Sequence, residues 1–180
     1  YLDGANRITD AGRAALAPYR VDNAVIMAAG MSSRFAPLSY EKPKALLKVK
    51  GEVLIEREIR QLQAAGIDDI TIVVGYMKEK LFYLEDRFHV KIVINEDYHR
   101  YNNPSTLMLV RDRLKNTFIC SSDNYFEQNP FEPYVYQAYY ASLYSAGKTD
   151  EYCMVTNRKG RITGVQVGGS DAWYMIGHAY

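Results

Sequence analysis

AVIMAAGMSSRFAPLSYEKPKALL, residues 24–47, is the stretch that decides the fold. Its first five residues form an apolar run of strand length, which ends at a turn of small residues around Gly30. Residues this small let backbone N–H groups approach an anion closely, and such groups bind phosphate without ordering long side chains. The sequence therefore predicts a strand followed by a phosphate-binding turn, with the candidate residues Ala28, Ala29, Gly30, Met31, Ser32 and Ser33.

Two cationic residues accompany this turn, Arg34 near its end and Lys44 in the Pro43-Lys44 pair that follows. Arginine makes fork-like contacts with phosphate oxygens, whereas lysine acts as a compact point charge. One of each suits a nucleoside triphosphate. Neither the glycine-rich dinucleotide fingerprint nor the Walker P-loop occurs in this stretch, which argues against those two kinds of nucleotide site.

The rest of the chain up to residue 122 alternates between helix and strand patterns. Apolar residues recur at helical spacing in 54–65, before Gly66 at the expected helix end, and again in 78–88. Apolar runs rich in β-branched residues predict buried strands at 70–74, 90–94 and 117–122. Such alternation, with right-handed crossovers, predicts an α/β fold with a mainly parallel sheet flanked by helices.

Gly30, Gly75 and Asp123 each follow the apolar run of a different strand. Ligands bind at the carboxyl ends of the strands in open α/β sheets, so these three residues are expected to lie together. A carboxylate there can hold Mg²⁺, which prefers oxygen ligands and often uses only one or two protein carboxylates. The alternative for Asp123 is a structural turn with Asn124 and Tyr125.

Small polar residues gather again around Pro104. Asn102 and Asn103 precede it, and Ser105 and Thr106 follow it. Their side chains can cap a helix over 106–113 and can also reach the edge of a pyrimidine base. Capping is the better supported of the two roles.

Composition is that of one ordinary enzyme domain, with 180 residues, 48% of them hydrophobic, and a net charge of +1. This balance does not call for nucleic acid. The chain has no apolar run long enough for a membrane span and no leader pattern, so we expect a cytoplasmic protein. Cys120 and Cys153 lie far apart without metal-ligand spacing, which favours buried free thiols over a disulfide.

Residues 1–23 form a separate N-terminal segment. Thr9 is expected to cap a short helix that runs through Leu16 and is ended by Pro18. The segment 7–13 resembles the final portion of a winged-helix DNA-binding domain, and only such a preceding domain would bring nucleic acid as a partner. The alternative is a plain helix packed on the domain formed by residues 24–180.

The region after Pro133 is rich in tyrosine and alternates like strands at 138–144, 150–156, 161–167 and 173–180. Aromatic faces attract quaternary ammonium groups. Packing is nevertheless the better expectation for most of these tyrosines. Glu151 has two equal alternatives: its charge balances that of a bound ammonium group, or it is a solvated acid at the end of a strand. The three histidines have no spacing relation to these motifs, and we assign them no role.

The pattern from Ala28 to Leu38, followed by 42–44 and by 49–55, resembles the signature of sugar-phosphate-type nucleotidyltransferases. Within them the chain is most similar to bacterial choline-phosphate cytidylyltransferases, through 74–79, 101–103 and 122–125. Many relatives carry glycine where Ser32 stands.

This resemblance implies a Rossmann-like nucleotidyltransferase fold that transfers a cytidylyl group from CTP to phosphocholine, giving CDP-choline and pyrophosphate. It implies that Lys44, Arg34 and Asp123 are catalytic, with Mg²⁺ on Asp123. It places Gly75, Tyr76, Asn103 and Thr106 with the turn residues at the nucleotide, and Tyr152 with Glu151 at the choline group.

Relatives of this kind continue past Tyr180, where they place a second acidic metal ligand and part of the acceptor wall. We therefore expect a chain truncated at its C-terminus, which binds nucleotide but turns over slowly. One alternative is a nucleotidyltransferase acting on a sugar phosphate or another amino-alcohol phosphate. The other is a non-catalytic nucleotide- or choline-binding regulatory module. The sequence leaves the oligomeric state open.

Overall fold

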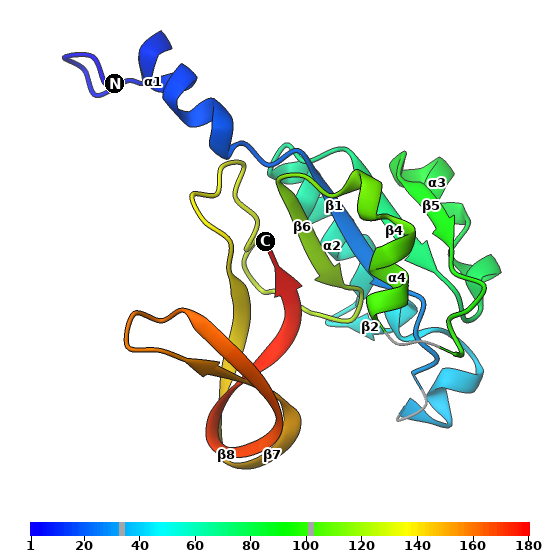
Figure 1. Ribbon diagram of the computed structural model, residues 1–180. Coiled ribbons are helices and arrows are strands. Elements are labelled where there is room, and N and C mark those ends of the chain that lie inside the picture. Colours follow the sequence, from blue (N-terminus) through cyan, green and yellow to red (C-terminus); the bar gives the residue numbers. More distant parts are fainter. Residues whose placement is uncertain (33–34, 101–102) are drawn as a thin grey trace.

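A computed structural model describes residues 1–32, 35–100 and 103–180. Within them, the main sheet has six strands in the order β5–β4–β1–β6–β8–β7 (Figure 1). They are β1 (Asn23–Ala28), β4 (Ile70–Val74), β5 (Lys91–Ile94), β6 (Thr117–Ser121), β7 (Tyr140–Thr156) and β8 (Ile162–Ala179). The first four strands in this order are parallel, and β8 and β7 are antiparallel additions. The predicted α/β fold with a mainly parallel mixed sheet is confirmed.

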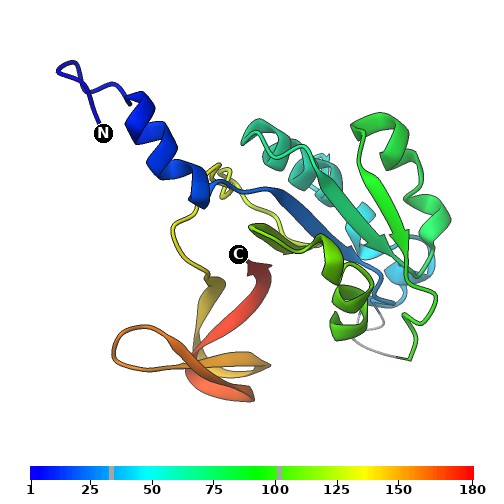
Figure 2. The same cartoon turned by 45° about the horizontal axis from the view of Figure 1, so that its top comes forward.

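Helices cover both faces of the parallel part of the sheet (Figure 2). Ile26 in β1 belongs to a core shared with α2 (Leu54–Ala64) and α3 (Tyr83–Phe88), whereas its neighbour Val25 packs with Leu107 of α4 (Asn103–Leu109). Successive side chains of a strand point to opposite faces, so an uninterrupted apolar run is required where both faces are covered. Each fully buried aliphatic side chain contributes about 1.5–3 kcal/mol to this packing.

A buried polar pair fixes how β1 and β6 are aligned. The Thr117 hydroxyl donates to Asn23 Oδ1 at 2.6 Å, and Asn23 Nδ2 donates to the carbonyl of Arg113 at 2.8 Å. Leaving either group unpaired in the core would cost about 1–3 kcal/mol, so a shift in register is disfavoured. The alignment brings Met27 opposite Ser121 and therefore sets the carboxyl ends of the two strands side by side.

Two of the predicted helices differ from those in the structure. Over 78–88 the chain forms a 3-10 turn, η5 (Lys78–Lys80), and then α3, because the amides of Lys80 and Leu81 bond to carbonyls three residues back. The predicted apolar face is nevertheless buried. The helix predicted over 106–113 begins earlier, at Asn103, and ends at Leu109 before the 3-10 turn η6 (Arg111–Arg113). Pro104 fits in its first turn, where an N–H group has no partner within the helix.

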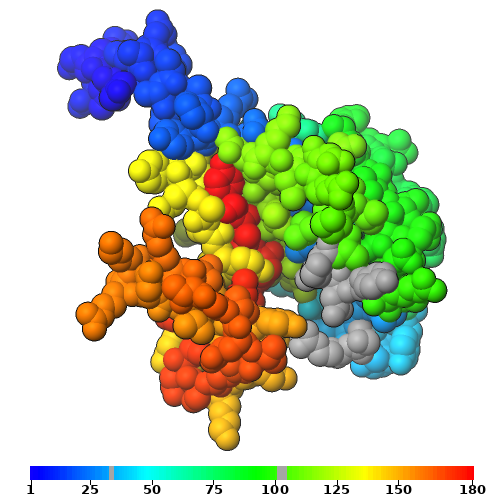
Figure 3. Space-filling model, viewed as in Figure 1, coloured from blue at the N-terminus to red at the C-terminus, as the bar shows by residue number. Residues whose placement is uncertain are grey.

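The tyrosine-rich region folds into two long strands instead of the predicted four short ones. β7 and β8 pair along their length as an antiparallel ribbon, which joins the sheet through the pairs Ile119–Ala179 and Cys120–His178. The space-filling view shows the orange and red part of this ribbon projecting from the rest of the molecule (Figure 3). Interruptions at Gly147, Gly168 and Asp171, all at positive φ, are bulges within continuous strands. Such bulges break the alternation without ending the strand.

The N-terminal segment agrees with its predicted local structure. Thr9 Oγ1 accepts a hydrogen bond from the Gly12 amide at 3.1 Å at the start of α1 (Asp10–Leu16), and Pro18 lies in the 3-10 turn η1 (Ala17–Tyr19) that follows. Figures 1 and 2 show this segment extending away from the sheet. Its resemblance to a winged-helix end stays a prediction.

Between β1 and α2 lie two short 3-10 turns, η3 (Leu38–Tyr40) and η4 (Lys44–Leu46), and a small hairpin of β2 (Lys48–Val49) and β3 (Glu52–Val53). Both cysteines are buried free thiols, as predicted. None of the helices in the described ranges combines the length and the apolar character that a membrane crossing requires.

Candidate active site

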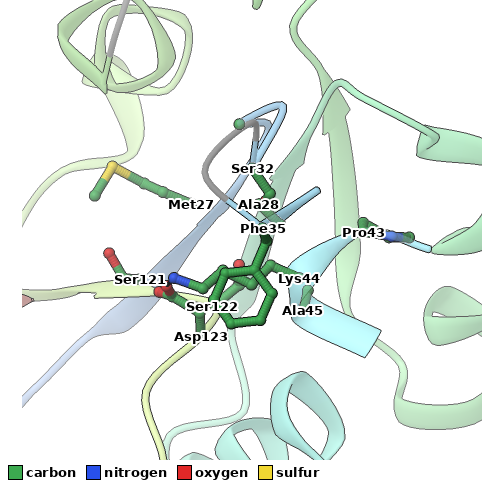
Figure 4. A pocket seen from close by; sticks show the side chains of 11 residues that line it. Met27, Ala28, Ser32, Phe35, Pro43, Lys44, Ala45, Ser121, Ser122 and Asp123 are labelled. Atoms are coloured by element: carbon green, nitrogen blue, oxygen red, sulfur yellow. Dashed lines mark hydrogen bonds and ion pairs between the residues drawn. The ribbon is translucent and has the colours of Figure 1, made fainter. Parts of the chain in front are cut away.

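A cavity of about 310 Å³ opens at the carboxyl ends of β1 and β6 (Figure 4). The small-residue turn after β1, the η4 segment and the end of β6 enclose it. Its lining consists of Met27, Ala28, Gly30, Ser32, Phe35, Pro43, Lys44, Ala45, Ser121, Ser122 and Asp123. This is the location at which an open α/β sheet binds its ligand.

Lys44 and Asp123 form an ion pair within this cavity. Their side chains are 35% and 28% exposed, so both remain accessible to a ligand. The Lys44 amine also lies 5.1 Å from the centre of the Phe35 ring, where the ring face attracts a cation. The structure thus brings together the predicted phosphate-binding lysine and the predicted metal-binding carboxylate.

Gly30 and Gly75 are required for different reasons. A Cβ atom at Gly75 would lie 2.7 Å from Tyr98 Cβ and 2.8 Å from the Ala29 carbonyl oxygen, so this position must be glycine for the wall to close. A Cβ at Gly30 would meet no atom of the described residues within 4 Å, although Gly30 lines the cavity. The absence of a side chain at Gly30 therefore leaves space in the cavity for a ligand. At Gly75 it leaves space for Tyr98 and the Ala29 carbonyl.

Tyr76 links the small-residue turn after β1 to the η3 segment through two hydrogen bonds. Its amide donates to the Ala29 carbonyl at 3.2 Å, and its hydroxyl donates to the Ser39 carbonyl at 3.0 Å. It supports the turn and is not among the residues that line the cavity. The placement of Tyr76 at the nucleotide stays a prediction.

Several other predicted site residues lie elsewhere. Thr106 is buried in α4, where its hydroxyl accepts a hydrogen bond from Asn95 Nδ2 at 3.1 Å, and Asn103 begins that helix. Tyr152 and Glu151 belong to β7, with Tyr152 58% exposed on the ribbon. The predicted roles of Ser33, Arg34 and Asn102 fall on residues outside the described ranges.

The turn residues Ala29 and Met31 do not line the cavity either, Ala29 being buried and Met31 exposed. Sequence reasoning in turn missed lining residues such as Phe35, Ser121 and Ser122. All three adjoin predicted motif residues, so widening each motif by one or two positions would have found them.

Two buried titratable groups lie behind the cavity. Glu58 of α2 is 2% exposed, and neither carboxylate oxygen has a hydrogen-bond partner among the described residues. Burial, and then the nearby charge of Asp123, raise the pKa of Glu58 well above its usual range. Burial lowers the pKa of His178 to about 4, and its Nε2 lies 3.0 Å from the Tyr139 hydroxyl. Burial therefore favours the neutral form of both groups, and His178 is neutral near pH 7.

The donor atoms around Asp123 fit Mg²⁺ that is shared with a ligand. A carboxylate and the neighbouring hydroxyls of Ser121 and Ser122 are hard oxygen donors. The described part of the chain contains no cluster of three or more His, Cys, Asp or Glu residues suited to a metal. A single carboxylate is compatible with Mg²⁺, which often uses only one or two protein carboxylates and keeps several waters.

Comparison with known proteins bears out the resemblance predicted from the motifs. A choline-phosphate cytidylyltransferase from Streptococcus pneumoniae is 39% identical over 132 residues, covering 73% of this chain and 58% of the relative. A 2-aminoethylphosphonate cytidylyltransferase from Lancefieldella rimae is 36% identical over 162 residues, covering 88% of this chain and 66% of the relative. The chain thus spans less than two thirds of the length of these relatives.

A solved structure of the CTP:phosphocholine cytidylyltransferase from Streptococcus pneumoniae superposes with a TM-score of 0.81 at 36% identity, covering 89% of this chain and 70% of that one. The model of the MobA-like NTP transferase domain matches residues 24–163, which include all but the first residue of β1, the cavity and β7, but only the first two residues of β8. The chain therefore belongs to the family of MobA-like NTP transferase domains.

Proposed function

We propose that this chain transfers a cytidylyl group from CTP to phosphocholine, giving CDP-choline and pyrophosphate. The observation that carries the proposal is the Lys44–Asp123 ion pair, which lies beside a small-residue turn at the carboxyl ends of β1 and β6. A cation and a carboxylate in one accessible cavity provide what a nucleoside triphosphate with its metal ion requires. The similarity to cytidylyltransferases favours CTP as that triphosphate.

The chemistry needs little from the protein beyond position and charge. A phosphate oxygen of phosphocholine attacks the α-phosphorus of CTP, and the bond to the pyrophosphate oxygen breaks. Because the attacking oxygen is already anionic near neutral pH, neither a serine nucleophile nor a strong general base is required. Catalysis can rest on orientation and charge neutralisation.

Each residue of the cavity has a role in this proposal. Lys44 leaves Asp123 to stabilise charge at the α-phosphate, and backbone amides from Ala28 to Ser32 bind the nucleotide. Asp123 holds Mg²⁺, which neutralises phosphate charge when bound. Arg34 is proposed to hold the departing pyrophosphate.

The acceptor is the less constrained half of the reaction. The relative from Lancefieldella rimae is named for 2-aminoethylphosphonate, and a 30% identical relative from Haloferax volcanii for glucose-1-phosphate. Phosphocholine differs from 2-aminoethylphosphonate in its quaternary ammonium, which cannot donate a hydrogen bond and is bound through aromatic faces. The ribbon presents such a face at Tyr152, which is 58% exposed. This ring favours phosphocholine as the acceptor.

Pyrophosphate release tests the proposal directly. The natural protein that contains these residues is mixed with CTP, Mg²⁺ and, in turn, phosphocholine, phosphoethanolamine, 2-aminoethylphosphonate or glucose-1-phosphate. We expect the highest kcat/KM with phosphocholine, and CDP-choline as the product by mass spectrometry. A higher kcat/KM with 2-aminoethylphosphonate would move the proposal to that acceptor, and CTP binding without turnover on any acceptor would favour a regulatory module.

A further inference from the structure

The two halves of the Lys44–Asp123 pair are carried by different segments of the chain. Lys44 lies near the start of the segment 43–53, which runs through η4, β2 and β3. Asp123 lies in the segment 121–127, which leaves β6. Neither segment is part of the same strand or helix as the other. Side chains reach from one to the other, among them the exposed ion pair of Lys50 with Glu127 and the contacts of Arg57.

Arg57 of α2 holds the Asp123 segment. Its Nε and Nη2 donate to the Phe126 carbonyl at 3.0 and 2.8 Å, and Nη2 also donates to the Glu127 carbonyl at 2.8 Å. Its guanidinium carbon lies 4.7 Å from the centre of the Tyr125 ring. Three consecutive residues directly after Asp123 and Asn124 are thereby fixed to one side chain.

The same guanidinium holds the Lys44 segment. Arg57 Nη1 forms an ion pair with Glu52 of β3. β3 pairs with β2, which follows Lys44 within a few residues, and the amide of Leu54 donates to the Leu47 carbonyl at 3.0 Å. The Arg57 side chain is 19% exposed, so these contacts are shielded from competing water.

The contacts of Arg57 go beyond what the packing of α2 needs. α2 already buries Ile55, Ile59 and Leu62 completely. Arg57 instead directs its donors at loop carbonyls, and Asn124 Nδ2 holds the other side of Asp123 by donating to the Ile176 carbonyl at 2.8 Å. A planar guanidinium with fixed donor directions suits such a bridge, whereas a lysine amine acts as a single point charge.

We propose that Arg57 is a positioning residue, which sets the spacing between Lys44 and Asp123 for nucleotidyl transfer. This inference rests on the proposed function. Because catalysis there depends on alignment, a loosened Asp123 segment should lower kcat while leaving most of the nucleotide affinity intact, since Arg57 has no contact with the described residues of the turn after β1.

Arg57→Ala and Arg57→Lys are compared with Arg60→Ala, a control on the next turn of the same helix. Arg60 forms an ion pair with Glu56 at 2.8 Å, approaches Glu52 only at 3.9 Å, and has no described contact with 125–127. For Arg57→Ala we expect kcat to fall about 10-fold to 100-fold, with the CTP dissociation constant from calorimetry changing less than about twofold. Arg57→Lys should recover only part of kcat, and Arg60→Ala should keep nearly all of it.

Adding guanidinium ion to the variants distinguishes a loss of positioning from a loss of stability. Millimolar guanidinium should raise kcat of Arg57→Ala without raising its Tm, and should not raise kcat of Arg60→Ala. A crystal structure of Arg57→Ala should show the Lys44–Asp123 pair separated, whichever acceptor the enzyme uses. If Arg57→Ala does not fold, Arg57→Lys carries the same kinetic and structural comparison.

Wild-type kcat in both Arg57 variants would overturn the inference, as would an intact Lys44–Asp123 pair in their crystal structures. A loss of kcat that follows Tm alone, with no response to guanidinium, would also overturn it. A wild-type protein that is inactive with every acceptor would instead overturn the proposed function. The crystal structures of the Arg57 variants would still show whether Arg57 positions the Lys44–Asp123 pair.

Discussion

The Lys44 amine and the Asp123 carboxylate are paired in one cavity although 79 residues separate them in the sequence. Each group thus neutralises the other before any ligand arrives. In the proposed reaction both must change partners, because Lys44 is needed at the phosphates and Asp123 at their metal ion. The first two predictions follow from this exchange.

Asp123→Asn should remove most turnover and leave Tm nearly unchanged. The carboxylate is partly exposed at the end of a strand, and such ion pairs contribute only about 0–1 kcal/mol to stability. Initial rates and thermal unfolding are measured together, with Asp171→Asn on the ribbon as the control. A normal rate combined with a large fall in Tm would show that Asp123 is structural.

Lys44→Ala should lower kcat more than it raises KM for CTP. An interaction that strengthens as charge grows in the transition state appears mainly in kcat, whereas uniform binding appears in KM. Lys48→Ala, a few residues later in β2, is the matched control. A loss confined to KM would assign Lys44 to ground-state binding alone.

Gly30→Ala and Gly75→Ala should have opposite signatures. The methyl group at residue 75 would overlap Tyr98 and the Ala29 carbonyl, and such overpacking costs about 1–3 kcal/mol, so Tm should fall. The methyl group at residue 30 meets no atom in the described part of the chain and lies at the cavity, so CTP affinity should fall at unchanged Tm. Calorimetry and thermal unfolding of both variants check this, and equal Tm losses would contradict the assigned geometry.

Glu58→Gln should make the protein more stable than the wild type, by an amount that grows as the pH rises. The raised pKa means that folded Glu58 keeps a proton which the unfolded chain releases above about pH 4.5, so the native protein loses stability from there up to the folded pKa. Glutamine removes this loss. Urea unfolding at about pH 5 and about pH 8 should show the advantage of the variant growing with pH.

Glu56→Gln on the same helix is the control for Glu58. Glu56 is ion-paired with Arg60 and Arg87, both at 2.8 Å, so its replacement should destabilise the protein near neutral pH. Equal stability of the wild type and Glu58→Gln at both pH values would show that Glu58 is solvated or paired.

Tyr152→Ala should weaken phosphocholine by about 0.5–2 kcal/mol and leave KM for CTP unchanged, if its ring contacts the ammonium. Tyr144→Ala is the control, because Tyr144 packs edge-on against Trp173 at 5.4 Å between ring centres. Equal weakening of both substrates by Tyr152→Ala would assign this tyrosine to packing.

The sequence was most informative where one physical rule dominates. Strands buried on both faces must be apolar throughout, which placed β1, β4 and β6 within a residue of their observed ends. The rule that ligands bind at strand ends then placed Gly30 and Asp123 at one cavity, whereas Gly75, expected with them, is not among the lining residues.

The remaining features depend on contacts that periodicity does not encode. The alternation in β7 and β8 breaks at Gly147 and Gly168, and a bulge and a turn give the same local signal. The helical pattern of 54–65 identifies a buried face but not the partners of its polar residues. The sequence therefore predicts no role for Arg57 or Glu58, whose surroundings depend on the loop after β6.

The joint between the ribbon and the sheet also bears on how the molecule folds and opens. β7 and β8 are connected by the turn at 157–161, so they can pair early with little loop-closure entropy. β1 must instead find β4 and β6, which arrive much later in the chain. With only two residue pairs joining β8 to β6, the ribbon can detach while the parallel strands stay closed, and its amides would exchange with solvent sooner than those of β1.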